Sequence, residues 1–371
     1  PSTLNELNYF TDNGYKLTKR AETLGIIAQP YNVTGVAGTH GKTSISTLLA
    51  HLLSFTDGGC DAFLGGISKN FNSNLVLGNR GANRLVVEAD EFDRSFLHLN
   101  PNLAIVTSMD ADHLDIYGSH QKVVEAFGQF VSAIKPKGIL IVKGTLKSGL
   151  SQWLRDDIKV YTYSLEGEAS FHPTDLKHIE GFYQFNLTTP NGIIENLELG
   201  VMGLYNAENA IAASAAALAC GIEPAQLAMG LKSFTGVKRR FEVLFRGTNT
   251  IYIDDYAHHP EELRATIGSA RSIFKGRKIT GVFQPHLYSR TKDFSNEFAE
   301  ALSLLDEVIL TEIYPAREAP IEGVTSEMLL SKVACPQKEI CSLNEVVGRL
   351  ATHDLDTVSY THLTLPTKRI V

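Results

Sequence analysis

The sequence has little of what marks secreted, metal-binding or membrane proteins. Its 371 residues include four cysteines, and the positions of Cys60, Cys220, Cys335 and Cys341 do not have the spacing of a metal site. We therefore interpret them as reduced, mostly buried thiols of a cytoplasmic protein. The first residues are polar and lack a basic start, so no signal peptide is visible, although the chain also begins without methionine.

Long apolar runs and basic stretches are also missing. The longest apolar run, residues 210–220, is far too short to span a bilayer, so we expect no membrane insertion. The net charge is −7 and the longest basic stretch is residues 238–240, which argues against nucleic acid as a partner. A hydrophobic content of 43% is ordinary for a globular protein, and the length suggests two or three domains. The oligomeric state is not indicated.

The most informative stretch that is present is residues 35–44. An apolar run that ends at Ala37 predicts a strand, residues 45–53 predict a helix, and glycines lie between them. Backbone amides in such a turn, with the positive end of the helix, hold a polyphosphate. We expect Lys42 to reach the terminal phosphates and the Thr43 hydroxyl to bind Mg²⁺. The expected nucleotide-binding residues of this loop are Gly38, Thr39, His40, Gly41, Lys42, Thr43 and Ser44.

Two predicted strands, residues 84–87 and 102–107, each end in an acidic cluster. In open α/β sheets ligands bind beyond the carboxyl ends of the strands, so a cation shared with the nucleotide fits there. Glu88 from the first cluster and His113 from the second are the expected metal ligands, together with Thr43. The alternatives are a solvated acidic loop and a histidine that caps a helix.

Residues 150–200 have the turn signals of antiparallel strands, which we expect to close one edge of the domain. An alanine-rich helix then begins near Gly203 and ends before Gly221. Asn206 and Asn209 are three residues apart near its start, so they share one face of the helix. Two amides there can recognise a heterocycle or cap the helix, and the pattern does not decide between the two.

A second α/β pattern starts near residue 243, after a short basic element that contains Arg240. Three predicted strands deliver polar groups at their carboxyl ends, as in a doubly wound sheet with a crevice along one edge. The polar residues at these ends include Asp255, His258, His259, His286 and Arg290. Such residues are hard to explain as core packing. Arg240 is either a solvated surface residue or a phosphate contact from across a domain joint.

These patterns predict an α/β protein in which a central P-loop ATPase domain with a mostly parallel sheet precedes a smaller Rossmann-like α/β domain. We expect the central domain at residues 32–236 and the second at 237–358. Residues 1–31 read as a helical lead-in and a linker. Residues 359–371 break the pattern, and we interpret them as a non-native tail.

Seven ordered motifs make the chain similar to the Mur ligases, the amide-bond ligases of peptidoglycan precursor synthesis. The motifs are residues 38–43 (GTHGKT), 88–91 (EADE), 112–115 (DHLD), 205–209 (YNAEN), 239–241 (RRF), 254–260 (DDYAHHP) and 283–286 with 289–291 (FQPH, SRT). The last two most resemble the members that join L-alanine to UDP-N-acetylmuramate. The resemblance implies that residues 1–31 are the last stretch of an N-terminal UDP-binding domain.

The resemblance also implies a two-step reaction with UDP-N-acetylmuramate and L-alanine as small-molecule substrates and with ATP and Mg²⁺. The muramic acid carboxylate attacks the γ-phosphate of ATP, and the acyl phosphate then reacts with the amine of L-alanine. The implied catalytic residues are Lys42, Glu88, His113 and Arg240. The implied contacts outside the loop are Asn206, Asn209, Arg240 and Asp255 for the nucleotide and His258, His286 and Arg290 for the amino acid.

Other functions remain open at this point. One is the recycling ligase that attaches a whole murein peptide to UDP-N-acetylmuramate. Another is a P-loop kinase or motor ATPase, which the histidine-rich second unit disfavours. A third is a non-catalytic nucleotide-binding fragment. Folylpolyglutamate-type ligases share the P-loop but should lack the His-His-Pro context.

Overall fold

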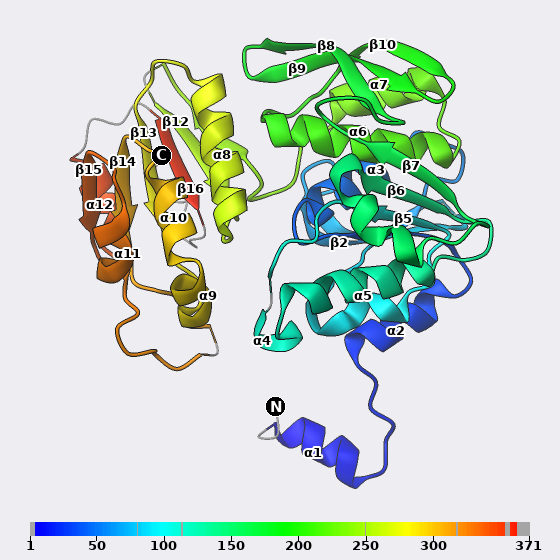
Figure 1. The fold of residues 1–371 in the computed structure, drawn as a ribbon, viewed down its shortest axis with the longest axis horizontal. Helices are drawn as coiled ribbons and strands as arrows, with labels where there is room; N and C mark the ends of the chain where they lie inside the picture. The colour runs from blue at the N-terminus through cyan, green and yellow to red at the C-terminus, as the bar shows by residue number, and fades with distance from the viewer. Residues whose placement is uncertain are drawn as a thin grey trace.

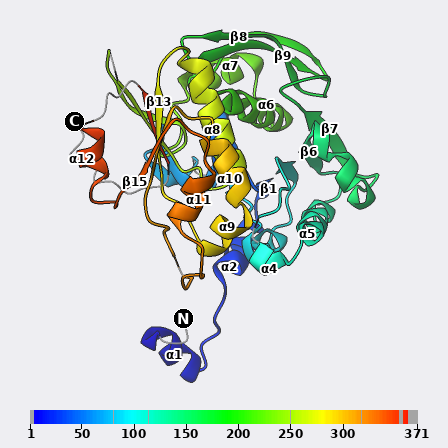
Figure 2. The ribbon, with the colours of Figure 1, turned by 60° about the vertical axis from the view of Figure 1, so that its left-hand side comes forward.

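The computed structural model describes residues 4–79, 81–112, 114–248, 250–316, 318–352 and 357–361. Figure 1 shows two lobes, the first formed by the blue-to-green part of the chain and the second by the yellow-to-red part. Helix α1 (Asn5–Asp12) lies apart from both lobes, and α2 (Arg20–Ala28) packs against the first. The turned view in Figure 2 shows the same separation of α1 from the rest of the chain.

Among the described residues, the first lobe is built on a seven-stranded sheet in the order β3–β2–β4–β1–β5–β6–β7. The edge strand β3 pairs antiparallel with β2, and the other pairs are parallel. The strands are β1 (Asn32–Ala37), β2 (Asp61–Ser68), β3 (Ser73–Val76), β4 (Arg84–Glu88), β5 (Leu103–Val106), β6 (Ile139–Lys143) and β7 (Lys159–Tyr163). Helices cover both faces of the central strands, which explains their continuous apolar runs.

One face of this sheet carries α3 (Lys42–Leu53), α6 (Leu204–Ala219) and α7 (Pro224–Ser233). The alanines of α6 are small enough for it to pack directly against α3. The other face carries α2, α5 (His120–Ser132) and the 3₁₀ helix η1 (Phe92–His98). The remaining short helices of this lobe are α4 (Leu114–Tyr117), η2 (Gly144–Leu146) and η3 (Ser148–Trp153).

A separate sheet lies at the top of the first lobe in Figure 1. It contains β8 (His172–Ile179), β9 (Phe182–Thr189) and β10 (Gly192–Glu198), all antiparallel. Antiparallel strands are therefore present as predicted, but β7, which lies in the same range of residues, is a parallel edge strand of the main sheet. Strands β8 to β10 form a sheet of their own, and the inner side chains of β9 pack into the core beside α6.

In the described part of the second lobe, six strands follow the order β11–β12–β16–β13–β14–β15. They are β11 (Glu242–Arg246), β12 (Ile251–Asp255), β13 (Ile279–Phe283), β14 (Glu307–Leu310), β15 (Gln337–Ile340) and β16 (Thr357–Thr361). All neighbours are parallel except β11 and β12. Residues 359–361, which we assigned to the tail, thus belong to β16, and residues 362–371 lie outside the described residues.

Helices cover both faces of this sheet as well. Helices α8 (Pro260–Ile273), α10 (Ser295–Leu302) and α11 (Ser326–Lys332) pack on one face, and α12 (Val346–Leu350) packs on the other. The short helix α9 (Tyr288–Asp293) follows the carboxyl end of β13. The predicted α/β class with a mostly parallel central sheet is confirmed.

The linker between the lobes is hydrogen-bonded to the end of β2. The backbone N–H of Lys69 donates to the carbonyl oxygen of Gly236 at 2.9 Å, and that of Lys238 donates to Ile67 at the same distance. An ion pair between Lys69 and Glu242, 3.2 Å long, adds a contact from the first lobe to β11. The residues that enter the second lobe are therefore positioned by the first.

The four cysteines are free thiols. Cys60, Cys335 and Cys341 are buried and Cys220 is partly exposed, in agreement with the prediction of reduced, mostly buried thiols. Of the helices in the described ranges, none combines the length and the apolar character that a membrane span needs.

Candidate active site

The loop between β1 and α3 turns at two glycines. Gly38 has a φ of 145° and Gly41 a φ of 81°, conformations that residues with side chains rarely adopt. A Cβ atom on Gly38 would lie 1.8 Å from Oγ1 of Thr107, so only glycine fits there. The backbone N–H of His40 donates to Oγ of Ser108 at 2.8 Å, which fixes the loop to the end of β5. Backbone N–H groups at such a helix start suit a phosphate.

Lys42, the first residue of α3, is held in a buried ion pair. Its Nζ lies 2.8 Å from Oε2 of Glu91 and donates to the carbonyl oxygen of Gly38 at 2.6 Å. The two side chains are 13% and 2% exposed. Burial by itself lowers the pKa of Lys42, but Glu91 and Glu88 raise it above its ordinary value, so the ammonium group stays charged. The sequence showed the acidic run but not that Glu91 is the partner of Lys42.

Two of the three expected magnesium ligands lie together. The Thr43 hydroxyl donates to Oε2 of Glu88 at 2.8 Å. Gly65 of β2 leaves room for this carboxylate, since a Cβ atom there would lie 2.0 Å from the same oxygen. Hydroxyl and carboxylate oxygens are ligands that Mg²⁺ prefers, and Mg²⁺ usually keeps several waters, so the pair fits this ion. His113, the third expected ligand, lies outside the described residues.

The described residues do not supply a larger metal cluster. Within them, no group of three or more His, Cys, Asp or Glu side chains has the arrangement of a metal site. A cation at this edge of the sheet would therefore use the Thr43 and Glu88 oxygens together with ligands from phosphate and water.

Arg240 lies where the linker enters the second lobe. Its neighbours Arg239 and Phe241 have φ values of 61° and 47°, so the backbone turns sharply on both sides. The guanidinium carbon of Arg240 lies 5.3 Å from the ring centroid of Tyr256, and Nη1 lies 3.8 Å from Oε1 of Glu262. The side chain borders the same cavity as the P-loop, which agrees with a phosphate contact from across the joint.

Asp255, at the end of β12, is buried and holds the surrounding loops. Its carboxylate accepts hydrogen bonds from the backbone N–H groups of Phe241 and Ala257, each at 2.7 Å. It also accepts one from the Tyr205 hydroxyl at 3.2 Å. Asp255, an expected nucleotide contact, thus borders the cavity of about 360 Å³. Its carboxylate already accepts three hydrogen bonds from the protein.

Asn206 and Asn209 lie on one face of α6, as predicted, but they border different cavities. Nδ2 of Asn206 donates to the carbonyl oxygen of Met202 at 2.7 Å, and Nδ2 of Asn209 lies 3.5 Å from Oδ1 of Asn206. Asn209 borders a cavity of about 360 Å³ beside Lys143, whereas Asn206 borders a neighbouring one of about 240 Å³ next to the linker. The Asn206 side chain therefore binds the backbone before α6 but does not cap the helix, and Asn209 faces the larger cavity.

His258, His286 and Arg290 come together at the carboxyl ends of β12 and β13. The two imidazole centroids lie 6.2 Å apart. Nη2 of Arg290 donates to Oδ1 of Asp112 at 3.0 Å, and this contact joins the two lobes. Burial lowers the pKa of His258, and burial with the charges of His258 and Arg290 lowers the pKa of His286 to about 4. Both imidazoles are therefore neutral near pH 7.

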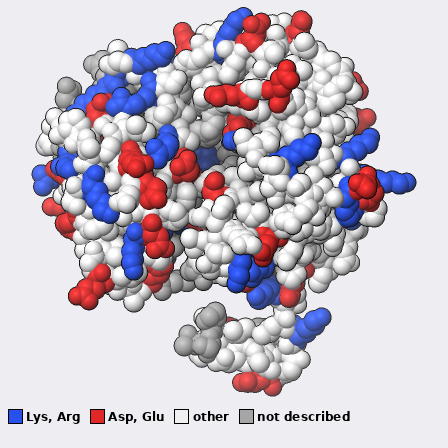
Figure 3. Space-filling model, in the orientation of Figure 1, with Lys and Arg blue, Asp and Glu red and all other residues white. Residues whose placement is uncertain are grey.

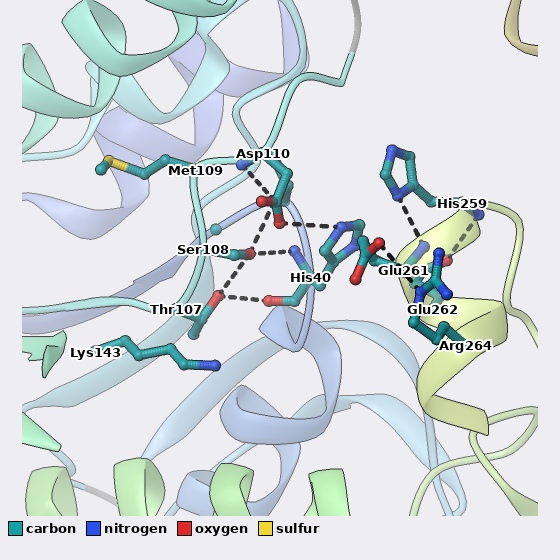
Figure 4. A network of polar contacts seen from close by, with 12 residues as sticks. His40, Thr107, Ser108, Met109, Asp110, Lys143, His259, Glu261, Glu262 and Arg264 are labelled. Atoms are coloured by element: carbon teal, nitrogen blue, oxygen red, sulfur yellow. Dashed lines mark hydrogen bonds and ion pairs between the residues drawn. The ribbon is translucent and has the colours of Figure 1, made fainter. Parts of the chain in front are cut away.

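His40 connects the P-loop with α8, as Figure 4 shows. Its Nδ1 lies 3.3 Å from Oε1 of Glu262, and its Nε2 lies 3.4 Å from Oδ2 of Asp110. The ring packs on that of His259 with centroids 4.8 Å apart. Burial by itself lowers the pKa of His40, but Glu262 and Asp110 raise it above its ordinary value. A sequence signal for Glu262 is its place three residues after His259, the N-cap of α8, which is the spacing of a capping box.

The face between the two lobes is hollowed, and both basic and acidic side chains lie along the depression (Figure 3). Two cavities of about 360 and 280 Å³ meet there. Both are bordered by His40, Gly41, Thr43, Arg240 and Glu262. Ser44 borders the larger cavity, and Thr39, Lys42 and Glu88 border the smaller one. Loop, acidic strand end and linker arginine thus converge between the lobes.

Two family models match the chain. The Mur ligase middle domain matches residues 36–217, and the Mur ligase, glutamate ligase domain matches residues 239–357. A relative from Porphyromonas gingivalis strain W83, named UDP-N-acetylmuramate–L-alanine ligase, is 46% identical over 359 residues, which cover 96% of this chain and 78% of the relative. A protein of the same name from Parabacteroides distasonis is 45% identical over 358 residues, covering 96% and 77%.

Solved structures agree with these matches. The UDP-N-acetylmuramate-alanine ligase of Thermotoga maritima superimposes with a TM-score of 0.78 at 25% identity, covering 96% of this chain and 78% of the other. A murein peptide ligase from Psychrobacter arcticus gives a TM-score of 0.68 at 22% identity over 97% and 80%, a likeness of fold alone. The resemblance inferred from the seven motifs is confirmed. The chain belongs to the Mur ligase family.

Proposed function

We propose that this protein is an ATP-dependent, ADP-forming ligase that joins L-alanine to the carboxylate of UDP-N-acetylmuramate in peptidoglycan precursor synthesis. The observation that carries the proposal is the identity of about 45% over 96% of the chain with ligases of that name. The geometry supports it, because the phosphate-binding candidates of the first lobe and His258 of the second border one hollow. The proposal includes a cytoplasmic location, which the use of ATP and a UDP-sugar and the free thiols support.

The first step transfers the γ-phosphate of ATP to the muramic acid carboxylate. Lys42, with the backbone amides of the P-loop, holds the phosphates, and Arg240 adds positive charge from the linker. Such transfer depends mainly on positioning and on stabilising charge, and the buried setting of Lys42 strengthens its effect. Asn206, Asn209 and Asp255 hold the nucleoside end. Thr43 and Glu88, with His113, hold Mg²⁺, which supplies further positive charge to the phosphates when bound.

In the second step the amine of L-alanine attacks the carbonyl carbon of the acyl phosphate, so that an amide bond forms, inorganic phosphate leaves and the amine loses a proton. Arg290 binds the amino-acid carboxylate, and the neutral imidazoles of His258 and His286 line the place beside it. These groups belong to residues 237–358, whereas the phosphate loop belongs to residues 32–236, which we propose as separate domains. The site is complete only when the two lobes come together.

The test is release of phosphate from ATP in the presence of UDP-N-acetylmuramate and one amine at a time. We expect release with L-alanine, and a product that contains a new amide bond. Release with a murein tripeptide instead would identify the recycling ligase. Turnover without any amine would indicate an ATPase, and tight ATP binding without amide product would indicate a nucleotide-binding fragment.

A further inference from the structure

One buried carboxylate contacts three separate parts of the site. Glu262, the third residue of α8, has a side chain that is 14% exposed. Its Oε1 lies 3.3 Å from Nδ1 of His40 in the P-loop and 3.8 Å from Nη1 of Arg240 in the linker. Its Oε2 accepts a hydrogen bond from the backbone N–H of His258 at 2.9 Å. Figure 4 shows Glu262 and His40 pointing toward each other from the two lobes.

We infer that Glu262 is a positioning residue of the reaction, and that its negative charge holds the P-loop, the linker arginine and the amino-acid loop in one arrangement. The inference rests on the proposed function. Glu262 acts through His40, Arg240 and His258, which lie nearer the substrates. Because phosphate groups and amino-acid groups come from different lobes, a small error in their relative position lowers the rate of bond formation.

The charge of Glu262 can be separated from its part in starting the helix. Its Oε2 also accepts the N–H of His259 at 3.3 Å, which completes a capping box at the start of α8. Glutamine does the same at this position in α7, where Oε1 of Gln226 accepts the N–H of Glu223 at 3.0 Å. Glutamine at position 262 would therefore keep the cap but remove the negative charge from between the histidine and the arginine.

The decisive variant is Glu262→Gln, with Glu22→Gln as its matched control. Glu22 is the capping-box residue of α2, where its Oε2 accepts the N–H of Lys19 at 3.1 Å, and α2 borders neither cavity. We expect E262Q to lower kcat/KM for both ATP and L-alanine at least about tenfold, measured at a temperature at which the variant is folded. We expect E22Q to change neither kinetic constant.

A second measurement does not depend on turnover. The groups that face the His40 imidazole are Glu262 on α8, Asp110 after β5, Lys42 on α3 and the ring of His259. In E262Q the carboxylate with the shortest contact to Nδ1 is lost. Asp110 is then the only one of these groups that still raises the pKa of His40 against the lowering effect of burial. We expect the pKa of His40, followed by NMR of its ring, to fall by at least about one pH unit in E262Q and to stay unchanged in E22Q.

Two further variants test the route of the effect. Glu262→Asp keeps the charge on a shorter side chain. We therefore expect its kcat/KM to be at least about threefold higher than that of E262Q. If the charge acts through His40, the fold-decrease in kcat/KM of the double variant H40Q/E262Q should be smaller than the product of the fold-decreases of the two single variants.

The outcomes are distinguishable. Wild-type kinetics and an unchanged His40 pKa in E262Q would overturn the inference. If the wild type released no phosphate with L-alanine, the proposed function would fail. The NMR comparison would still decide whether Glu262 holds His40.

Discussion

Nη2 of Arg290 lies 3.0 Å from Oδ1 of Asp112, and this contact crosses from the second lobe to the first. Both side chains are only 7% exposed, so each neutralises a charge that burial would otherwise make costly. In the proposed reaction the carboxylate of L-alanine binds the same guanidinium. Amino-acid binding and the contact between the lobes are therefore linked at Arg290.

We predict that Arg290→Ala mainly weakens binding of L-alanine. A hydrogen bond between charged groups contributes about 1.5–3 kcal/mol, so KM for L-alanine should rise between about 10-fold and about 150-fold. This KM is measured from the rate of phosphate release as L-alanine is varied at saturating ATP and UDP-N-acetylmuramate. Arg290→Lys is the control that keeps the charge but not the planar guanidinium group. Its KM for L-alanine should lie between that of the wild type and that of Arg290→Ala. An unchanged KM in the alanine variant would remove this role.

Replacement of Lys42 should abolish ADP formation. We expect Lys42→Ala to lower kcat about 10³-fold, because the loop loses its only charged donor to the terminal phosphates within the described P-loop residues. Near-normal turnover would refute the P-loop assignment.

The partner of Lys42 gives a matched stability experiment. In K42A the Glu91 carboxylate, 2% exposed, loses its cation, so the free energy of unfolding should fall by about 3 kcal/mol. The double variant K42A/E91Q should regain much of this stability in urea unfolding but none of the activity. Recovery of both would show that the charge of Lys42 is not needed for the reaction.

Gly65 provides a test of the proposed magnesium ligands. A Cβ atom at this position would lie 2.0 Å from Oε2 of Glu88, so Gly65→Ala must displace the carboxylate from Thr43. We expect the Mg²⁺ concentration for half-maximal activity to rise about tenfold. Gly268→Ala in α8, where a Cβ atom meets nothing within 4 Å, is the control and should leave the Mg²⁺ dependence as it is. The same Mg²⁺ dependence of activity in Gly65→Ala and Gly268→Ala would argue against Glu88 as a ligand.

The stability of the protein should fall on mild acidification, in part through His259. Burial, with the neighbouring His40, lowers the pKa of His259 to about 4, so the unfolded chain binds a proton at a higher pH than the folded one. This effect is absent above about pH 6.5 and grows as the pH falls from there toward 4. Between pH 7.5 and 5.0 it amounts to about 2 kcal/mol.

The comparison is urea unfolding of the wild type and of His259→Asn at both pH values. The His259 side chain accepts the N–H of Glu261 at the start of α8, and asparagine can do the same. The wild type should therefore lose about 2 kcal/mol more than the variant on acidification. Equal losses in the two proteins would mean that the His259 pKa is not depressed.

Much of the site was predictable because parallel strands end at one edge of a sheet. The P-loop after β1, Glu88 at the end of β4 and His258 after β12 each belong to a local pattern of an apolar strand that ends in polar residues. Local patterns also predicted two α/β units. That the strand ends of both units border one hollow followed from the family resemblance, and the cavities agree with it.

The pairing of side chains across the lobes could not be read from the sequence. Glu262 looks like an ordinary capping residue, and its contact with His40 depends on how the lobes meet. The same holds for Asp112, whose partner Arg290 is 178 residues away. That strands β8 to β10 form a separate sheet could not be predicted for a related reason: an alternating pattern is compatible with either sheet, and the packing beside α6 decides.

The position of β16 has a consequence for how the protein is made. This strand is the last in the described chain, yet it lies between β12 and β13, which are not hydrogen-bonded to each other directly. During translation the ribosome must therefore release residues 357–361 before the two halves of that sheet can be joined. All the described strands of the first lobe are synthesised much earlier, so that lobe can begin to fold before the second lobe has its central strand.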